Sequence, residues 1–153
     1  MSIKTISDNR KAFHEYTITD RYEAGIALTG SEVKAARAGK VNLTDGWVDV
    51  TEDGEAILRD AHIGRYSHGG YANHAELRPR KLLLNKVEIL KLSRSIAEKG
   101  FTVVALKMYF KEQFIKVEIG VAKGKKLHDK RESTATREAG REMQRALRER
   151  NKS

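Results

Sequence analysis

The apolar pattern of the chain ends in one segment, residues 120–131, which reads GVAKGKKLHDKR. Before this segment, apolar residues recur with the periods of strands and helices. From residue 122 onward, the only apolar residues larger than alanine are Leu127, Met143 and Leu147. So few large apolar side chains cannot form a packed core. We therefore predict a folded domain over residues 1–122 and a C-terminal tail over residues 123–153 that is disordered by itself.

The charge of the chain divides at the same place. Residues 1–122 contain 19 Lys and Arg against 16 Asp and Glu, whereas residues 123–153 contain 11 against 5. A basic tail favours a polyanionic partner, and nucleic acid in particular, because counterion release rewards many weak phosphate contacts. The alternative, a solvated tail that only aids solubility, stays open at this point.

The composition excludes several classes of protein. The chain has no cysteine, which excludes a disulfide scaffold, thiol catalysis and a cysteine-ligated zinc site. No stretch approaches the roughly 20 apolar residues of a membrane span, and the N-terminus has no apolar run of signal-peptide length. We therefore expect a cytoplasmic protein without a membrane partner.

The first third of the chain predicts a hairpin and a short helix. Residues 1–11 are polar and are interpreted as a lead-in without regular structure. From Phe13 onward, apolar residues alternate on both sides of a turn at Thr19-Asp20, which indicates two paired strands. Thr29 and Glu32 have the spacing of a capping box, which predicts a helix over residues 33–38 that ends at Gly39.

The middle of the chain predicts a second hairpin, a loop and a longer helix. Gly54 marks a turn between strands over residues 47–51 and 55–63. Residues 64–79 are rich in glycine, histidine and polar side chains and are interpreted as a long loop. Asn85 is a candidate N-cap for a helix that buries Ile89, Leu92 and Ile96 and ends at Gly100.

The strongest strand signal lies over residues 101–111 and 115–121, which are joined by a turn at Glu112-Gln113. On the first of these strands, the even-numbered residues from 102 to 110 are expected to share the core face, while Lys107, Tyr109 and Lys111 face outward. Six strands in three sequential hairpins indicate a mainly β fold, a closed or nearly closed antiparallel barrel with accessory helices. An open sandwich is the alternative.

Three histidines raise the possibility of a metal or acid-base site in the predicted loop region. His62, His68 and His74 lie within 13 residues, with Asp60 and Glu76 nearby. Their spacing matches no metal-ligand signature, so surface histidines or histidines that stack on RNA are favoured over a metal-dependent nuclease.

The tail has a helical charge pattern. In a helix, four arginines would share one face, while alanines, Met143 and Leu147 would lie opposite. We expect this helix to form against RNA, where neutralisation of phosphates offsets the cost of ordering. The four arginines are Arg137, Arg141, Arg145 and Arg148.

Six motifs, in order along the chain, resemble the SsrA-binding protein family of bacteria, also called small protein B or SmpB. The resemblance is collinear from about residue 9 to residue 131. The motifs are Asn9-Arg10-Lys11-Ala12-x-His14-Glu15-Tyr16, Tyr22-Glu23-Ala24-Gly25-Ile26, Gly30-Ser31-Glu32-Val33-Lys34, Arg37-Ala38-Gly39-Lys40, Arg80-Lys81-Leu82-Leu83-Leu84 and Gly124-Lys125-Lys126-x-His128-Asp129-Lys130-Arg131.

The resemblance implies an oligonucleotide-binding-type barrel whose tail becomes ordered on the ribosome. It also implies a non-catalytic trans-translation factor, without cofactor or metal, that binds the tRNA-like domain of transfer-messenger RNA (SsrA RNA). The implied partners are that RNA, the 30S subunit and the 70S ribosome, and elongation factor Tu through the RNA complex, with the protein itself a monomer.

The resemblance further implies two groups of site residues. Those at the surface for the tRNA-like domain would be Asn9, Arg10, Glu23, Lys34, Arg37, Lys40, Lys81 and Leu83. Those near the decoding centre and mRNA channel would be Gly124, Lys125, Lys126, His128, Asp129, Lys130, Arg131, Arg137, Arg141 and Arg145. Because a carboxylate repels phosphate, Glu23 would either accept hydrogen bonds from RNA or hold a neighbouring cation. A generic ribosomal or RNA-chaperone barrel and a ribonuclease that uses the histidines are the alternatives.

Overall fold

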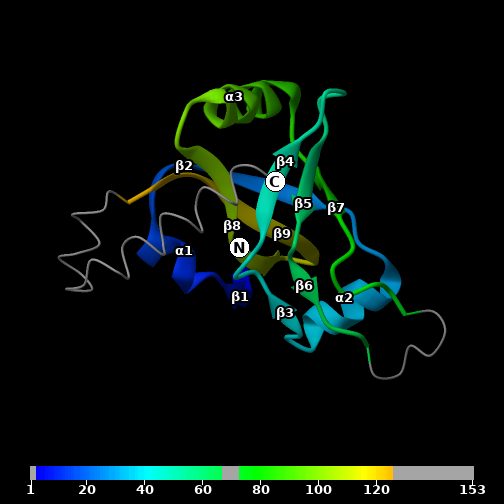
Figure 1. Cartoon of the computed structure of the whole chain (residues 1–153). Coiled ribbons are helices and arrows are strands. Elements are labelled where there is room, and N and C mark those ends of the chain that lie inside the picture. The colour runs from blue at the N-terminus through cyan, green and yellow to red at the C-terminus, as the bar shows by residue number, and fades with distance from the viewer. Residues whose placement is uncertain (1–2, 67–72, 126–153) are drawn as a thin grey trace.

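The computed structural model describes residues 3–66 and 73–125, which form a mainly β fold with three helices at its periphery (Figure 1). The helices are α1 (Arg10–Glu15), α2 (Gly30–Arg37) and α3 (Lys86–Ala97). The strands are β1 (Ile3–Asp8), β2 (Tyr16–Ile26), β3 (Val41–Asn42), β4 (Trp47–Val50), β5 (Ala56–Arg59), β6 (His62–Ile63), β7 (Arg80–Leu83), β8 (Phe101–Lys111) and β9 (Phe114–Gly124). The predicted fold class, mainly β with accessory helices, is confirmed.

The strands pair in an order that differs from three sequential hairpins. The 7-stranded sheet has the order β1-β8-β4-β5-β7-β2-β9, with an additional pairing between β8 and β9, and β3 pairs with β6 in a 2-stranded sheet. The hairpins β4–β5 and β8–β9 are confirmed, and Gly54 in the first turn has φ +81°. The first predicted hairpin is wrong, because β2 pairs with β7 and β9 along its length.

A β-bulge replaces the turn predicted at Thr19-Asp20. Ile18 pairs with Ala122 and Asp20 pairs with Val121, so Thr19 is one extra residue in a single 11-residue strand. The Thr19 hydroxyl donates to the Val121 carbonyl at 3.4 Å. An extra residue turns the following side chains to the opposite face of the sheet.

Strand β8 contains a second irregularity, which corrects the predicted core face. The register shifts between Ala105 and Lys107, so Leu106 is the extra residue. Met108 lies in the main core, whereas Val104 and Leu106 lie in a second apolar cluster on the other side of the sheet. The even-numbered residues of this strand therefore do not share one face.

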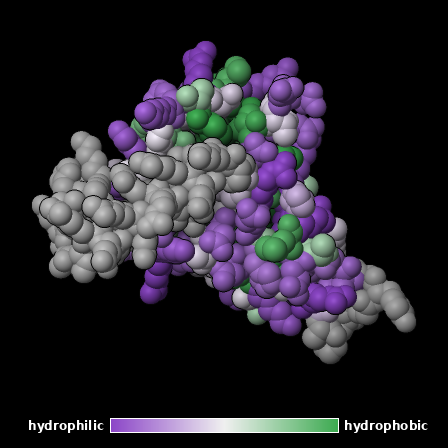
Figure 2. Space-filling model, viewed as in Figure 1, coloured by the Kyte–Doolittle hydropathy of each residue, from purple (hydrophilic) through white to green (hydrophobic). Residues whose placement is uncertain are grey.

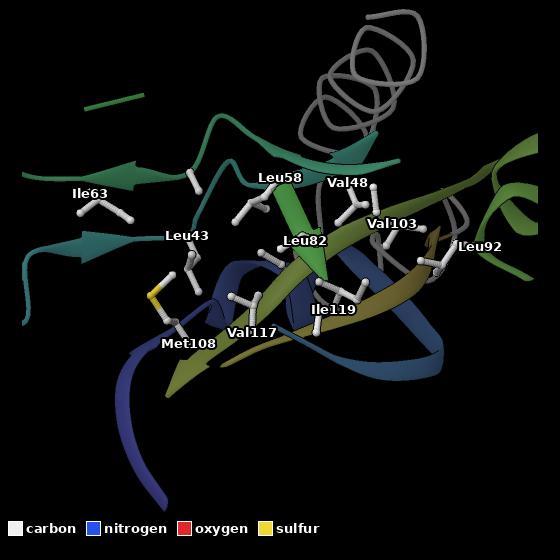
Figure 3. Close-up of a cluster of buried hydrophobic side chains, with 14 of the residues drawn as sticks. Leu43, Val48, Leu58, Ile63, Leu82, Leu92, Val103, Met108, Val117 and Ile119 are labelled. Carbon is white, nitrogen blue, oxygen red and sulfur yellow. The ribbon is translucent and has the colours of Figure 1, made fainter. Parts of the chain in front are cut away.

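The main core lies inside the curved sheet (Figure 3). Strand β9 supplies its odd-numbered residues to this core, as predicted, and α3 contributes Leu92, which is completely buried. The labelled members in the close-up are Leu43, Val48, Leu58, Ile63, Leu82, Leu92, Val103, Met108, Val117 and Ile119.

The N-terminal residues are not a lead-in. Strand β1 pairs with β8, and α1 packs a second cluster against the outer side of β2, β8 and β9. This cluster leaves no room for a side chain at Gly120, where a Cβ would lie 2.7 Å from Leu106 Cδ1. Its members are Ala12, Tyr16, Val104, Leu106 and Ala122, with Ile18 packed against them.

The predicted caps at the starts of α2 and α3 and the end of α2 before Gly39 are confirmed. However, α2 begins at Gly30 and not at Val33, and α3 ends at Ala97, before the predicted Gly100. Thr29 and Glu32 form a capping box at the start of α2, and Gly39 beyond its end has φ +77°. Asn85 and Glu88 form the equivalent box at the start of α3. Such boxes satisfy backbone amides that have no partner within the helix.

Strand β9 ends at Gly124, two residues beyond the predicted limit of the folded domain. Within the described part of the chain, no helix has the length and apolar character needed to cross a membrane. The predicted site residues Lys126, His128, Asp129, Lys130 and Arg131, the arginines of the tail, and His68 lie outside the described residues.

Candidate nucleic-acid interface

The outer face of strands β2, β9 and β8 has two halves. In one half, Val104 and Ile18, which are cross-strand partners of Gly120 and Ala122, pack with Ala12 of α1 in the second cluster. The rest of the outer face carries the polar alternate residues of β9, Lys116 and Glu118, whose neighbours Val117 and Ile119 point into the core. We name this second part the open half. It is rich in charged and aromatic side chains, and several of them interact.

Glu23 forms the centre of a network on the open half. The Tyr109 hydroxyl donates to Glu23 Oε2 at 2.5 Å, and the Lys111 ammonium lies 3.2 Å from Glu23 Oε1. The Tyr109 hydrogen bond, together with Lys111 and Lys116, holds the pKa of the Glu23 carboxyl below its usual value. Burial, followed by the hydrogen bond to Glu23, raises the pKa of Tyr109. Glu23 therefore remains charged and holds a neighbouring cation, the second of its two expected roles.

Leu83 and Lys116 lie on either side of Gly25, beside this network. Gly25 on β2 pairs with Leu83 on one side and with Lys116 on the other. Directly paired residues project from the same face of a sheet, and the Leu83 side chain packs over Gly25, where a Cβ would lie 3.2 Å from Leu83 Cβ. A groove of about 270 Å³ occupies this region, and its walls include Leu83, 56% exposed, and Phe114, 57% exposed.

A second groove adjoins the first. Gln113, in the turn between β8 and β9, lines both of them, and Arg37 of α2 lines the second with Lys4 and Phe110. The Lys116 ammonium lies 5.9 Å from the centre of the Phe114 ring. Glu23 and Leu83, which are far apart in the sequence, therefore lie on one surface that also presents an aromatic ring and lysines, while Arg37 lies at the second groove.

The structure places the other cations predicted for the RNA-binding surface on α2, just after α2 and on β7. Lys34 of α2 places its ammonium 5.5 Å from the centre of the Tyr66 ring, and Lys40 donates to the Arg65 carbonyl at 3.3 Å. Both therefore approach the start of the long loop. Lys81 is exposed on β7 and lies 3.8 Å from Glu55.

Asn9 lies in the interior, which corrects its expected surface position. It is 2% exposed, and its amide donates to the Leu43 carbonyl at 3.0 Å and to the Ala105 carbonyl at 2.7 Å. Its side-chain oxygen accepts from the Ala12 amide and caps α1. These bonds satisfy the buried amide. The Asn9 side chain therefore holds α1 in place from the interior.

Gly124 and Lys125 lie beside α1, at the far end of β9 from Phe114. Gly124 pairs with Tyr16, and the Lys125 amide donates to the Glu15 carbonyl at 3.2 Å. Arg10, the first residue of α1, is exposed. The start of the tail is therefore fixed to the body by backbone hydrogen bonds, near α1.

A buried ion pair fixes α2 against the loop that precedes β7. Glu32 and Arg80 are both completely buried and are linked by a 2.5 Å hydrogen bond, while Arg78 donates to the other Glu32 oxygen at 2.6 Å. Burial alone would raise the pKa of Glu32, but hydrogen bonds from Arg78, the Thr29 amide and Arg80 outweigh it and lower the pKa to about 2. This pair positions the helix that carries Lys34 and Arg37.

The histidines of the loop region have structural partners. His74 bridges the Ser31 hydroxyl at 2.8 Å and the Ile63 carbonyl at 2.9 Å, and His62 lies 3.2 Å from Glu76. Over residues 3–66 and 73–125, no three His, Asp or Glu side chains form a group suited to a metal ion. His74 thus holds the loop against α2.

Sequence reasoning did not single out several of these residues for function. Tyr109 and Lys111 were placed correctly on the outward face, and alternation along residues 115–121 also marks Lys116 as outward. The sequence signal for Phe114 is weaker: it is only a large apolar residue that directly follows a turn. Arg80 belongs to one of the six motifs, but the sequence does not show its pairing with Glu32, which lies 48 positions away.

The whole chain is similar to known proteins. The family model described as SmpB protein matches residues 6–149. An SsrA-binding protein of Geobacter metallireducens is 52% identical over 153 residues, covering 100% of this chain and 99% of that protein. An SsrA-binding protein of Carboxydothermus hydrogenoformans is 52% identical over 147 residues, covering 96% of this chain and 98% of that protein. A solved chain from "tmRNA-SmpB: a journey to the center of the bacterial ribosome" has a TM-score of 0.67 and 49% identity, covering 78% of this chain and 84% of that chain.

Proposed function

Because this chain belongs to the SmpB family of SsrA-binding proteins, we propose that it is a trans-translation factor. It binds the tRNA-like domain of transfer-messenger RNA and delivers that RNA to the vacant A site of stalled ribosomes, where the nascent peptide is tagged and the ribosome released. The observation that carries this proposal is the 52% identity with an SsrA-binding protein over 153 residues.

The open half of the outer face is the proposed surface for the tRNA-like domain. It combines lysines, an exposed aromatic ring and a carboxylate held in a fixed network, which are groups that contact phosphates, stack on bases and accept hydrogen bonds. Glu23 and Leu83 would contact the RNA on this surface, and Lys34, Arg37, Lys40 and Lys81 would contribute further cations to the contact. Arg10, on α1, would contact it from the other end.

The tail is the proposed ribosome-binding part. Its net charge of +6, from 11 cations against 5 anions in residues 123–153, suits a channel lined with phosphates. Gly124 and Lys125 fix where the tail leaves the body. The residues from Lys126 to Arg131 would act near the decoding centre, and Arg137, Arg141 and Arg145 would follow the empty mRNA channel.

The finer architecture and partners belong to the same proposal. The pairings lead from β8 through β4, β5, β7, β2 and β9 back to β8, which supports a closed barrel of the oligonucleotide-binding type. We further propose that the protein is a cytoplasmic monomer without catalytic activity. It would meet elongation factor Tu through the RNA that both proteins bind.

Binding measurements at two salt concentrations test the function. Full-length protein is titrated with transfer-messenger RNA and with a control RNA of equal length. A specific surface keeps its preference for transfer-messenger RNA as salt rises, whereas purely basic binding weakens equally for both RNAs. Equal affinities at raised salt would reject the proposal in favour of a generic RNA-binding barrel. Cleavage of RNA that disappears in His74→Ala would instead indicate a ribonuclease.

A further inference from the structure

Helix α3 carries apolar residues on its solvent side. The helix lies at one end of the sheet, where it contacts β4, β8 and β9 (Figure 1). Its inner side is marked by Leu92, which is completely buried. At 100° per residue, Val87 and Leu90 lie about 140° and 160° around the helix axis from Leu92. They are 59% and 58% exposed, so two large apolar side chains project into solvent from what we name the outer face of α3.

Three cations accompany these apolar residues. Lys86, Lys91 and Arg94 are exposed, and within the described part of the chain none of them takes part in an ion pair. The one carboxylate of the helix, Glu88, accepts a hydrogen bond from the Asn85 amide in the capping box. The end of the molecule where α3 lies mixes hydrophobic with hydrophilic residues on its surface (Figure 2). The outer face therefore combines exposed apolar groups with an uncompensated positive charge.

Charge argues against an occupant that comes from this chain itself. A second copy that packed its α3 antiparallel to this one, centred on Leu90, would place Lys86 of each copy beside Arg94 of the other, and like charges repel. The tail is equally unsuitable, because residues 123–153 contain 11 cations against 5 anions. The complementary partner is therefore a different molecule that carries acidic groups.

The arrangement of the side chains favours a protein over RNA or a membrane. Protein interfaces have an apolar centre and a polar rim, and on α3 the apolar pair has Lys86 on one side and Lys91 on the other. Unpaired RNA bases are held largely by stacking on aromatic rings, and α3 has no aromatic residue. Two apolar side chains are few for a helix that lies in a membrane surface. An acidic amphipathic helix has both kinds of group that this face requires.

We propose that the outer face of α3 docks an amphipathic helix of an acidic partner protein, whose apolar residues pack on Val87 and Leu90. The carboxylates of the partner pair with Lys86, Lys91 and Arg94. A helix of 12 residues is about 18 Å long, so the contact is smaller than the roughly 800 Å² per partner of a standard interface. Binding is therefore weak between the separate molecules and becomes effective where a second interaction holds them together.

The test titrates full-length, 15N-labelled protein with two designed helical peptides and follows the amide signals of α3. Both peptides carry leucines with a helical period, and the remaining positions are glutamate in one and lysine in the other. The glutamate peptide should bind with a dissociation constant of about 0.1 to 1 mM and the lysine peptide should not. Leu90→Gln should weaken binding at least about fivefold. The double variant Lys91→Glu with Arg94→Glu should reverse the preference, so that it binds the lysine peptide.

Leu77→Gln is the matched control. Leu77 is also exposed, at 57%, but lies between β6 and β7 and outside α3. Its variant should bind the glutamate peptide within about twofold of wild type. Thermal unfolding monitored by circular dichroism checks that every variant is folded.

A photo-reactive side chain identifies what occupies the outer face during translation. Leu90→p-benzoylphenylalanine is irradiated in an active bacterial translation extract, and the cross-linked products are sequenced by mass spectrometry. The expected product joins position 90 to a helix of another protein in which Asp and Glu flank apolar residues. Cross-links confined to RNA, to lipid or to a second copy of this chain would overturn the proposal.

The titration can also overturn the proposal. It fails if the glutamate peptide leaves the α3 signals unchanged at about 1 mM, if both peptides bind equally, or if Leu77→Gln loses as much affinity as Leu90→Gln. These measurements use no RNA, so their outcome is separate from that of the proposed function. A protein that showed no preference for transfer-messenger RNA but bound the glutamate peptide at α3 would retain this docking surface.

Discussion

The Tyr109 hydroxyl donates a 2.5 Å hydrogen bond to the Glu23 carboxylate across strand β9, which lies between the strands that carry the two residues. Lys111 adds an ion pair to the same carboxylate. Three neighbouring strands are therefore linked on the open half, and a carboxylate, a phenol and an ammonium group have fixed positions before RNA binds. Preorganisation of this kind lowers the entropic cost of association.

Glu23→Ala should reduce the preference for the tRNA-like domain over control RNA by roughly tenfold, because Tyr109 and Lys111 lose the group that orients them. The melting temperature should change by only a few degrees, since Glu23 is exposed. Competition binding and thermal unfolding provide the two measurements. Glu118→Ala is the matched control, because it removes a carboxylate directly opposite Glu23 in the sheet. An equal loss of preference in both variants would show that only net charge matters.

The free energy of unfolding should depend on pH through Glu32. Its folded-state pKa of about 2 lies below the ordinary 4.5. The unfolded state therefore takes up the proton first, and the stabilisation is complete above about pH 5 and is lost as the pH falls towards 2. The difference corresponds to about 3 kcal/mol. Urea unfolding between pH 7 and pH 2.5 measures it.

Glu32→Gln should destabilise the protein at neutral pH by about 3 to 5 kcal/mol, because Arg80 would remain buried without its counter-charge. If the variant still folds, its stability should vary less with pH than that of wild type. Glu55→Gln, on an exposed carboxylate, supplies the control and should behave like wild type. A Glu32→Gln protein with wild-type stability would contradict the assigned role of the buried pair.

Arg37→Ala should weaken binding of the tRNA-like domain at low salt and reduce the slope of log affinity against log salt by about one. We expect this effect because Arg37 lines the second groove, together with Gln113. Lys91→Ala removes an exposed cation from α3 and should leave the slope unchanged. Identical slopes for the two variants would place Arg37 outside the contact surface.

Truncation after Lys125 should keep binding of the tRNA-like domain within about threefold while abolishing peptide tagging on stalled ribosomes. The truncation is placed after Lys125 because the Lys125 amide donates a hydrogen bond to the Glu15 carbonyl and because Gly124 is the last residue of β9. A tagging assay and an RNA-binding assay on the same preparation separate the two activities. Parallel loss of both would argue against a division of labour between body and tail.

Local signals predicted α2 and α3, whereas α1 was missed and the sheet required information from distant residues. The capping boxes at Thr29 and Asn85 depend on side chains three positions apart, so the sequence displays them directly. Around Thr19, the apolar residues occupy even-numbered positions both before and after the bulge. A hairpin turn at this place would give the same sequence pattern. Only pairing with β9 distinguishes the two. Strand β1 was missed because its side chains are mostly exposed.

The candidate site was predictable in part. The resemblance named Glu23 and Leu83, and alternation placed Tyr109 and Lys111 outward. The groove itself was not predictable, because it depends on the pairing of Gly25 with residues 58 and 91 positions later in the chain. The opposite error occurred at Asn9, where a motif position was taken for a contact although its side chain is buried.

Strand β9 sets the distance between the two proposed activities. From Lys116, beside the groove, to Gly124, where the tail begins, eight residues span about 26 Å at the usual rise of a strand. Both ends of this strand are anchored to β2, at Gly25 and at Tyr16. In the proposed function, the folded domain would therefore act as a rigid spacer, because the position of the bound RNA would dictate where the tail enters the ribosome.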